Sequence, residues 1–292
     1  MHPAPSVIAF TTLSGAGFGL LVWIGLGLIT PTGWAAFGFF ALAYALAAGG
    51  LMASTFHLGH PERALLAFTQ WRTSWLSREG WASVAALMVM AVYGAGLVFF
   101  SSAWPAFGWI GAALSLVTIG TTSMIYAQLR TVPRWRHWTT PAMFFATGLA
   151  GGALLTGQAA VTLPLLALAG IVQVVAWVTG DGRMAASGTD IATATGLGGI
   201  GKVRSFEPPH TGTNYLLKEM VYEVGRRRSG QLRVLGLGLG YGIPILMLLL
   251  PQSVVLTAIA ALGHIVGVAA TRWLFFAEAE HVVGLYYGKR AA

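Results

Sequence analysis

The sequence predicts an all-α integral membrane protein with eight transmembrane helices arranged as four hairpins. Three observations support this fold class. Only 9% of the 292 residues are charged and 56% are hydrophobic, whereas soluble domains usually carry about 25% charged residues. The charged residues fall between long blocks that contain none, and each block has a turn signal near its middle. A soluble domain of this composition is the much weaker alternative, because only a chain that buries its surface in lipid can lack so many charges.

The charge-free blocks set the number of predicted spans. No Asp, Glu, Lys or Arg occurs in residues 1–61, 80–129, 137–180 or 234–271. A helix that crosses the ~30 Å hydrocarbon core needs about 20 residues, so each block is long enough for two spans. Proline and small polar residues predict turns at 30–33, 101–105, 157–164 and 251–253. The predicted spans, which form a single domain over 1–292, are 7–29, 34–55, 81–101, 106–128, 141–157, 163–180, 234–250 and 254–276.

The distribution of charge predicts the orientation. All 17 Lys and Arg residues and all nine acidic residues lie in the three long connections, the C-terminal tail or the last turns of the eighth helix. With an even number of spans, both termini and these connections share one face. Cytoplasmic loops are enriched in Lys and Arg, so we expect this face to be cytoplasmic, in a bacterial inner membrane. The net charge of +8 then concerns topology and membrane lipids, not nucleic acid, although a basic face that binds a partner subunit would look similar.

The first connection, "FHLGHPERALLAFTQWRTSWLSREGW", gathers ionisable residues and tryptophan at one depth. His57 follows the second predicted span, and Glu79 lies at the start of the third. The helix dipole and the free backbone N–H groups at a helix start favour a carboxylate there without any further role. The arginines near it can be interfacial anchors. Reduction of a quinone, however, requires protons to move with the electrons, and a histidine or carboxylate at the membrane boundary can relay them. The candidates for a quinone site here are His57, Arg63, Arg78 and Glu79, with Trp75 as an accessory residue.

The second connection, "YAQLRTVPRWRHW", repeats this composition. A basic cytoplasmic loop with an aromatic belt is the simpler interpretation. The residues that can add to the quinone site are Tyr126 and Arg130, with Trp135 and His137 as accessory residues and Arg134 and Arg136 as candidates for partner docking.

The third connection, residues 181–233, contains a predicted amphipathic helix. The apolar residues of "NYLLKEMVYEVGRRR" fall on one face from about Tyr215 to Arg227. A basic amphipathic helix can lie on the bilayer surface or dock a partner. The candidates for partner docking in this helix are Tyr215, Lys218, Arg226 and Arg227.

The composition also limits the cofactors. The chain has no cysteine, so it cannot hold a cluster through thiolates. Membrane-embedded b haems usually take two histidines, whereas His264 alone lies deep inside a predicted span. We therefore expect no iron–sulfur cluster, haem or metal site, and interpret His264 as a hydrogen-bonded packing residue. Arg272 and Glu278, near the charged face, are further accessory candidates.

Several of these motifs carry a family resemblance. "HLGHPERALLAF", "RTSWLSRE" and "YxxxRTVPxW" resemble the membrane anchor subunits of the dimethyl sulfoxide reductase family, while "PPHTGTNYLLKEM" and "RWLFFAEAEHVVGLYYG" are most similar to the anchor of the membrane-bound sulfite dehydrogenase branch. The resemblance implies an iron–sulfur subunit and a molybdopterin catalytic subunit as partners, with ubiquinone or menaquinone as electron carrier and no haem. The family's histidine and glutamate correspond to His57 and Glu79. Arg63, Arg78, Tyr126 and Arg130 match by motif.

The expected function is to pass electrons from sulfite oxidation, carried out by the partner subunits, to the quinone pool. The resemblance and the predicted cytoplasmic face favour sulfite, since sulfoxide reductases of this type commonly lie on the periplasmic side. The main alternative is a quinol-oxidising anchor of such a reductase. A tether without quinone chemistry and a solute transporter are further alternatives. A transporter usually has ionisable residues or broken helices at mid-membrane, where we find little besides His264.

Overall fold

The computed structural model describes residues 1–56, 58–207, 212–221 and 228–288. Within these ranges the regular elements are all helical, as predicted, and none is a strand. Seven of the described helical segments are long and apolar enough to cross a membrane: α1 (Pro5–Gly25), α2 (Gly33–Thr55), α3 (Trp75–Phe99), α4 (Pro105–Ala127), α6 (Ala159–Gly180), the segment Ser229–Leu248 and α12 (Val254–Ala277). The helix α5 (Thr139–Leu155) is apolar but has 17 residues, the lower end of what a span requires. An eighth span therefore depends on α5.

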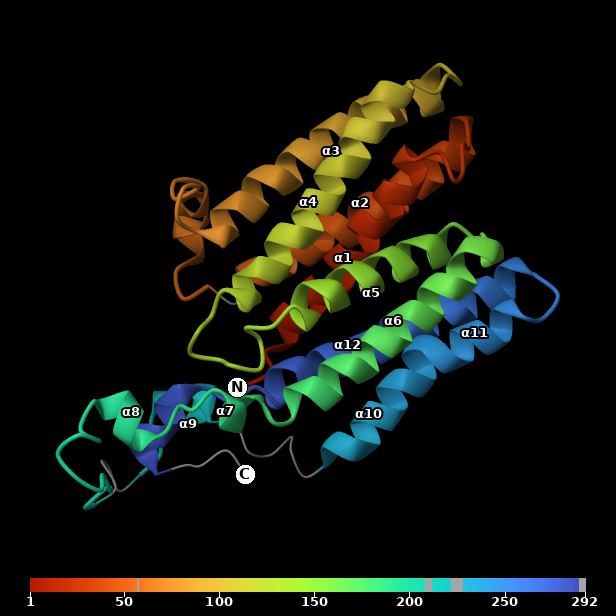
Figure 1. The fold of residues 1–292 in the computed structure, drawn as a ribbon. Coiled ribbons are helices and arrows are strands. Elements are labelled where there is room, and N and C mark those ends of the chain that lie inside the picture. Colours follow the sequence, from red (N-terminus) through yellow and green to blue (C-terminus); the bar gives the residue numbers. More distant parts are fainter. Residues whose placement is uncertain (57, 208–211, 222–227, 289–292) are drawn as a thin grey trace.

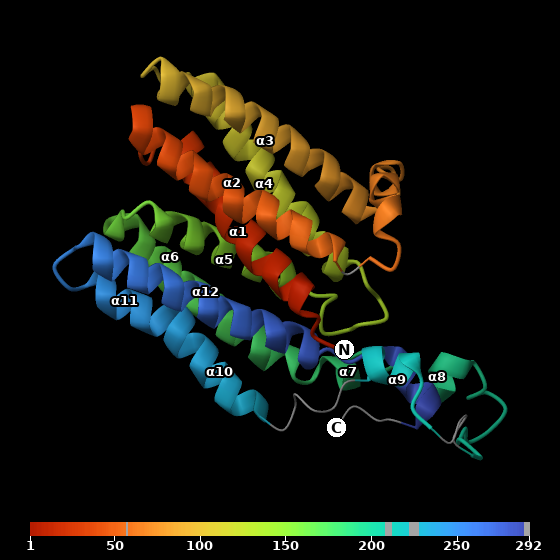
Figure 2. The same ribbon diagram turned by 180° about the vertical axis from the view of Figure 1, so that it is seen from behind.

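The helices pack side by side with α1 at the centre. This helix contacts α2, α4, α5 and α12, and most of its residues from Phe10 onward are buried. Figures 1 and 2 show the short turns after α1, α3, α5 and α11 at one end of the bundle, here named the turn end. The connections that follow α2, α4 and α6 lie at the other end, here named the charged end. The amino group of Met1 also lies at the charged end, where it donates to the carbonyl of Ala279, 2.8 Å away.

Glycine allows the closest helix contacts, as the small-residue spacings in the sequence suggest. A Cβ added to Gly19 on α1 would lie 1.9 Å from the carbonyl oxygen of Gly148 on α5. One added to Gly152 would lie 2.1 Å from the carbonyl carbon of Gly19. A Cβ at Gly267 on α12 would likewise lie 2.0 Å from the nitrogen of Gly240. These contacts fix α1 against α5, and α12 against the segment before α11.

Two helices differ from their predicted ranges in ways that bear on the site. The helix α3 begins at Trp75, not at residue 81, because the side chain of Ser74 caps it by accepting from the backbone N–H of Ser77. Glu79 therefore lies in the second turn, beyond the free N–H groups of the helix start. The segment Ser229–Leu248 is built from α10 (Ser229–Leu237), a π-helical turn η3 (Gly238–Gly242) and α11 (Ile243–Leu248). Such turns are inserted into helices and often lie at functional sites.

The connections at the charged end contain short helices. They are η1 (Pro61–Phe68), α7 (Arg183–Ala186), α8 (Ile191–Thr195), α9 (Tyr215–Met220) and η4 (Val282–Tyr287). Asn214 caps α9 by accepting from the N–H of Leu217. The described part of this helix stops at Met220, since Val221 has non-helical angles (φ −119°, ψ 64°). The amphipathic helix is thus shorter in its described part than predicted, and residues 222–227, which include Arg226 and Arg227, lie outside the described residues.

Candidate functional site

A carboxyl group is buried between α3 and α4 near the charged end. Glu79 is 3% exposed, and the hydroxyl of Thr122 on α4 is hydrogen-bonded to its Oε1 atom. The same hydroxyl lies 2.9 Å from the carbonyl oxygen of Thr118. Buried carboxyl groups are uncommon unless they are paired, so a buried carboxyl group in a membrane-spanning helix is a candidate functional residue.

An aromatic cluster surrounds Tyr126, one turn along α4 from Thr122. Tyr126 is 7% exposed, and its ring contacts four others at centroid distances of 5.4 to 5.7 Å, those of Trp135, Phe144, Phe275 and Phe276. Trp135 stacks on Phe275 at 5.1 Å and donates its indole N–H to the Phe275 carbonyl at 2.9 Å. The cluster joins α4, α5 and α12, and thereby fixes the depth of Tyr126 below the charged end.

A buried cation lies against the same cluster. Arg272 on α12 is 2% exposed, and its guanidinium carbon lies 3.8 Å from the centre of the Phe144 ring. The ring of Tyr126 contacts the same Phe144 ring, with the two centroids 5.7 Å apart. The phenol of Tyr126 and the guanidinium of Arg272 thus contact one aromatic cluster. The Glu79 carboxyl group is hydrogen-bonded to Thr122, one turn from Tyr126 on α4. We name Glu79, Thr122, Tyr126 and Arg272 the buried polar group.

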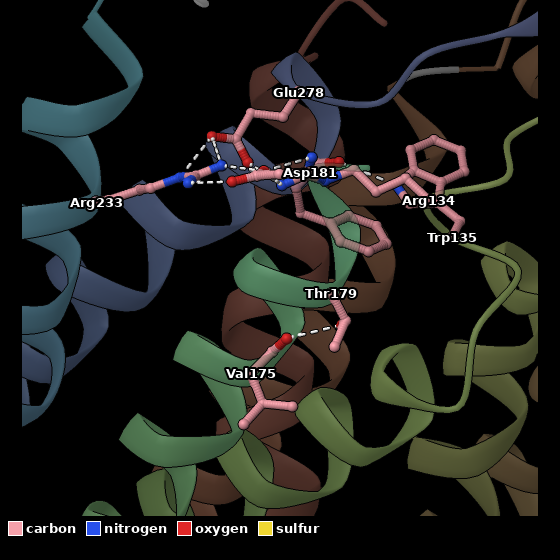
Figure 3. A network of polar contacts seen from close by, with 8 residues as sticks. Arg134, Trp135, Val175, Thr179, Asp181, Arg233 and Glu278 are labelled. Atoms are coloured by element: carbon pink, nitrogen blue, oxygen red, sulfur yellow. Dashed lines mark hydrogen bonds and ion pairs between the residues drawn. The ribbon is translucent and has the colours of Figure 1, made fainter. Parts of the chain in front are cut away.

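Four charged residues form a network at the charged end (Figure 3). Arg134 donates to Glu278 at 2.6 Å and to Asp181 at 3.0 Å. Arg233 donates to Glu278 at 2.8 Å and to Asp181 at 2.6 Å. The network ties the α4–α5 connection to the ends of α6 and α12 and to α10. Hydrogen bonds from Arg233, and the charges of both arginines, hold the pKa of Asp181 below its ordinary value. Burial raises the pKa of Glu278, although both arginines oppose this.

The predicted arginines of the first two connections lie elsewhere. Arg78 rests 4.3 Å from the centre of the Trp75 ring and donates to the carbonyls of Trp71 and Arg72 at 3.0 and 2.6 Å, so it supports the connection. Arg63 and Arg130 are exposed. None of these three has a described contact with the buried polar group. His57 lies outside the described residues.

The remaining predicted residues lie at the surface of the charged end. His137 is half-buried, with Nδ1 2.9 Å from the hydroxyl of Thr139. Burial and the charge of Arg183 lower its pKa. Arg136, Tyr215 and Lys218 are exposed and therefore accessible to a partner, whereas the guanidinium of Arg134 is committed to the internal network.

A separate groove lies at the turn end. It has a volume of about 820 Å³ and is lined mainly by apolar residues of α2 and α12, with Phe39, Leu42 and Ile265 among them. Its polar lining comes from the turns, including Thr156, Gln252 and Ser253. A groove of this composition in a membrane-spanning bundle fits lipid chains.

Comparison with known proteins identifies the family. The model of the DMSO reductase anchor subunit family (DmsC) matches residues 1–186. The chain is also 33% identical to a sulfite dehydrogenase subunit of Allochromatium vinosum, over 98% of this chain and 99% of that protein.

The chain belongs to the DMSO reductase anchor subunit family. The resemblance seen in the sequence is therefore confirmed, as is the identity of the chain as a membrane anchor subunit of an oxidoreductase. Because the sequence contains no cysteine, this anchor cannot hold a thiolate-bound iron–sulfur cluster of its own. His264, as expected, is a buried packing residue, with Nδ1 2.6 Å from the carbonyl oxygen of Gly240.

Sequence reasoning missed several residues of this anchor's polar groups. Thr122 precedes Tyr126 by one helical turn, a spacing that places both on one face of α4. Asp181 and Arg233 stand at the ends of the third connection, where the sequence indicates only charges at a membrane boundary. Their pairing with residues of other connections depends on the fold and has no local signal.

Proposed function

We propose that the chain is the quinone-reactive anchor of a sulfite-oxidising complex. An iron–sulfur subunit and a molybdopterin catalytic subunit bind at its charged end, which faces the cytoplasm. Electrons released when sulfite is oxidised to sulfate pass through the partner subunits to a quinone near that end. Each quinone takes up two electrons and two protons to become a quinol. The name of the similar Allochromatium vinosum protein supports sulfite as the substrate of the complex.

The buried Glu79 carboxyl group carries the proposal. A quinone needs a proton donor for each carbonyl oxygen as it is reduced, and a carboxyl group shielded from water can hold and deliver a proton. The hydroxyl of Thr122 can serve Glu79 in both protonation states. It donates to the ionised carboxylate, or it accepts from the protonated group while donating to the Thr118 carbonyl. Glu79 and Thr122 are therefore suited to proton exchange.

The neighbours of Glu79 add charge and shape. Arg272 is a fixed positive charge that favours negative charge on the reduced quinone. The packed aromatic rings around Tyr126 form one side of the proposed quinone site. In this proposal Glu79 delivers protons, with His57 as its relay at the membrane boundary. Arg272 supplies the positive charge in this proposal, since Arg63, Arg78 and Arg130 have no described contact with the buried polar group.

Partner docking falls to the exposed surface of the charged end. Arg136 and Lys218 are exposed cations there, and Tyr215 is an exposed aromatic residue on α9. Aromatic and arginine side chains are enriched at protein interfaces. Arg134 acts indirectly in this scheme, because its ion pairs hold the α4–α5 connection that presents Arg136.

Quinone-linked turnover of the purified complex tests the proposal. We expect Glu79→Gln to abolish most sulfite-dependent reduction of a quinone analogue while sulfite oxidation with a soluble artificial acceptor stays at the wild-type rate. Glu62→Gln is a matched control, since Glu62 is an exposed glutamate of the connection before α3 and pairs only with His60 among the described residues. Full quinone-linked turnover in Glu79→Gln would refute the assignment.

The runner-up is a quinol-oxidising anchor of a DMSO reductase-type complex, which the family model equally supports. It uses the same residues in the reverse direction and is expected on the periplasmic side. Accessibility of a cysteine introduced at Ser205, in the third connection, to a membrane-impermeant reagent separates the two. Labelling only after the cytoplasmic side is opened supports sulfite oxidation, and labelling of intact cells with a permeable outer membrane supports the reductase.

A further inference from the structure

Arg272 carries hydrogen-bond donors that nothing in the described part of the chain satisfies. Its Nε and Nη1 atoms are buried without a partner, and the guanidinium contacts the face of Phe144. A buried charge that lacks hydrogen bonds is costly, and the contact with an aromatic face replaces only part of what water would supply. An unseen partner of the guanidinium is therefore expected.

A second unpaired group faces the same region. The hydroxyl of Thr12 on α1 is buried and has no partner among the described residues. Its neighbours on α1 differ, since Thr11 donates to the carbonyl of Val7 at 2.9 Å and Ser14 to that of Phe10 at 2.6 Å. The unpaired state of Thr12 is thus a property of its position and not of buried hydroxyls on this helix.

A small cavity lies between these groups. It has a volume of about 10 Å³, and Thr12, Thr147, His264 and Arg272 are among its lining residues, which come from α1, α5 and α12. A single water molecule needs about 10–15 Å³ and two to four polar partners. The cavity matches one water and is far too small for a quinone ring.

We propose that this cavity binds one water molecule, which accepts one hydrogen bond from the guanidinium of Arg272 and one from the hydroxyl of Thr12. The water oxygen can accept two hydrogen bonds, so one guanidinium N–H and the Thr12 hydroxyl fill its acceptor positions.

The water gives Arg272 a fixed place beside the quinone-reactive residues. Arg272 and Tyr126 pack on the same ring, that of Phe144. Anchored by water to α1, the guanidinium keeps its charge at the depth of Tyr126 and Glu79. Thr12 is then a positioning residue for the quinone reaction, which acts through Arg272. This consequence rests on the proposed function, whereas the water site itself does not.

A high-resolution cryo-EM map of the complex, purified with its native partner subunits, tests the water site directly. We expect density for one water between Arg272 and Thr12 in the wild type and in Ser14→Ala, and none in Thr12→Val, which replaces the hydroxyl by a methyl group. Thr12→Ser, which keeps the hydroxyl, is expected to retain the water. An empty cavity in the wild type overturns the proposal, whatever the quinone-linked activity.

Turnover tests the positioning role. We expect Thr12→Val to lower quinone-linked turnover about tenfold, the size expected when buried donors lose a partner. Thr12→Ser and Ser14→Ala should keep the wild-type rate, as should artificial-acceptor activity in all variants. Wild-type quinone-linked turnover in Thr12→Val overturns the positioning role. Failure of the proposed function is distinguishable, because it shows as full activity of Glu79→Gln with the water density unchanged.

Discussion

Thr122 of α4 is hydrogen-bonded to the buried Glu79 carboxyl group of α3, 43 residues away in the sequence. The same hydroxyl reaches the carbonyl of Thr118 in its own helix. A hydroxyl with one proton to donate and two acceptors within reach can change its direction when Glu79 gains or loses a proton. The pair therefore joins helix packing to proton exchange.

Replacing Thr122 should separate these roles. We expect Thr122→Val to lower quinone-linked turnover about tenfold, because Glu79 loses its one described hydrogen-bond partner. Thr122→Ser should restore most of the activity, since serine keeps the hydroxyl. Steady-state assays over a range of pH check this, with an altered pH profile expected in the valine variant alone. Equal activity in the valine and serine variants would show that the hydroxyl has no part in the reaction.

The network around Glu278 should dominate the stability of the charged end. Glu278→Gln leaves two arginines without their buried partner and is expected to lower the free energy of unfolding by about 3 kcal/mol. Asp181→Asn is expected to cost less, about 1 kcal/mol, because the Asp181 side chain is 47% exposed and that of Glu278 only 6%. Thermal unfolding in detergent measures both. A larger loss for Asp181→Asn would contradict this ranking.

The glycine contacts between α1 and α5 should not tolerate a methyl group. In Gly19→Ala the new Cβ would lie 1.9 Å from the Gly148 carbonyl oxygen, so the helices must separate and stability falls by about 1–3 kcal/mol. Gly49 on α2 is the matched control, because a Cβ there meets nothing within 4 Å. Gly49→Ala should be neutral or stabilise by up to about 1 kcal/mol. If the two variants had the same unfolding midpoint, the packing described for α1 would be contradicted.

Acidification should weaken the C-terminal contacts through His281. Its Nδ1 atom accepts from the N–H of Val283 at 3.0 Å, and only the unprotonated atom can do so. Burial and the charge of the amino terminus lower the pKa of His281 in the folded protein. Below about pH 6.5 the unfolded chain therefore binds a proton at His281 more readily than the folded chain does. Stability should therefore fall as pH drops from 7 to 5, by up to ~1.4 kcal/mol per pH unit.

His281→Asn tests this assignment, because asparagine keeps an acceptor but does not titrate. The pH dependence of the unfolding midpoint should become shallower, with the remainder expected from His137, whose pKa is lowered in the same direction. An unchanged slope would show that His281 does not control acid stability.

Sequence reasoning succeeded where the signal is local or periodic. The charge-free blocks predicted where the helices lie. The predicted start of the third span was six residues late, because the cap provided by Ser74 was missed, and this placed Glu79 at a helix start. Arg134 and Glu278, 144 residues apart in the chain, meet only after several helices have packed. The unpaired donors of Arg272 likewise emerge only when α1, α5 and α12 come together.

The most direct test of the account is where a quinone binds. Photo-crosslinking of the complex with a photoreactive quinone analogue, followed by mass spectrometry, locates the headgroup. The account predicts labels at the charged end, on peptides near Glu79, Tyr126 and Arg272, which excess quinone removes and which Glu79→Gln weakens. Competed labels confined to the groove at the turn end, around Phe39 and Ile265, would contradict it.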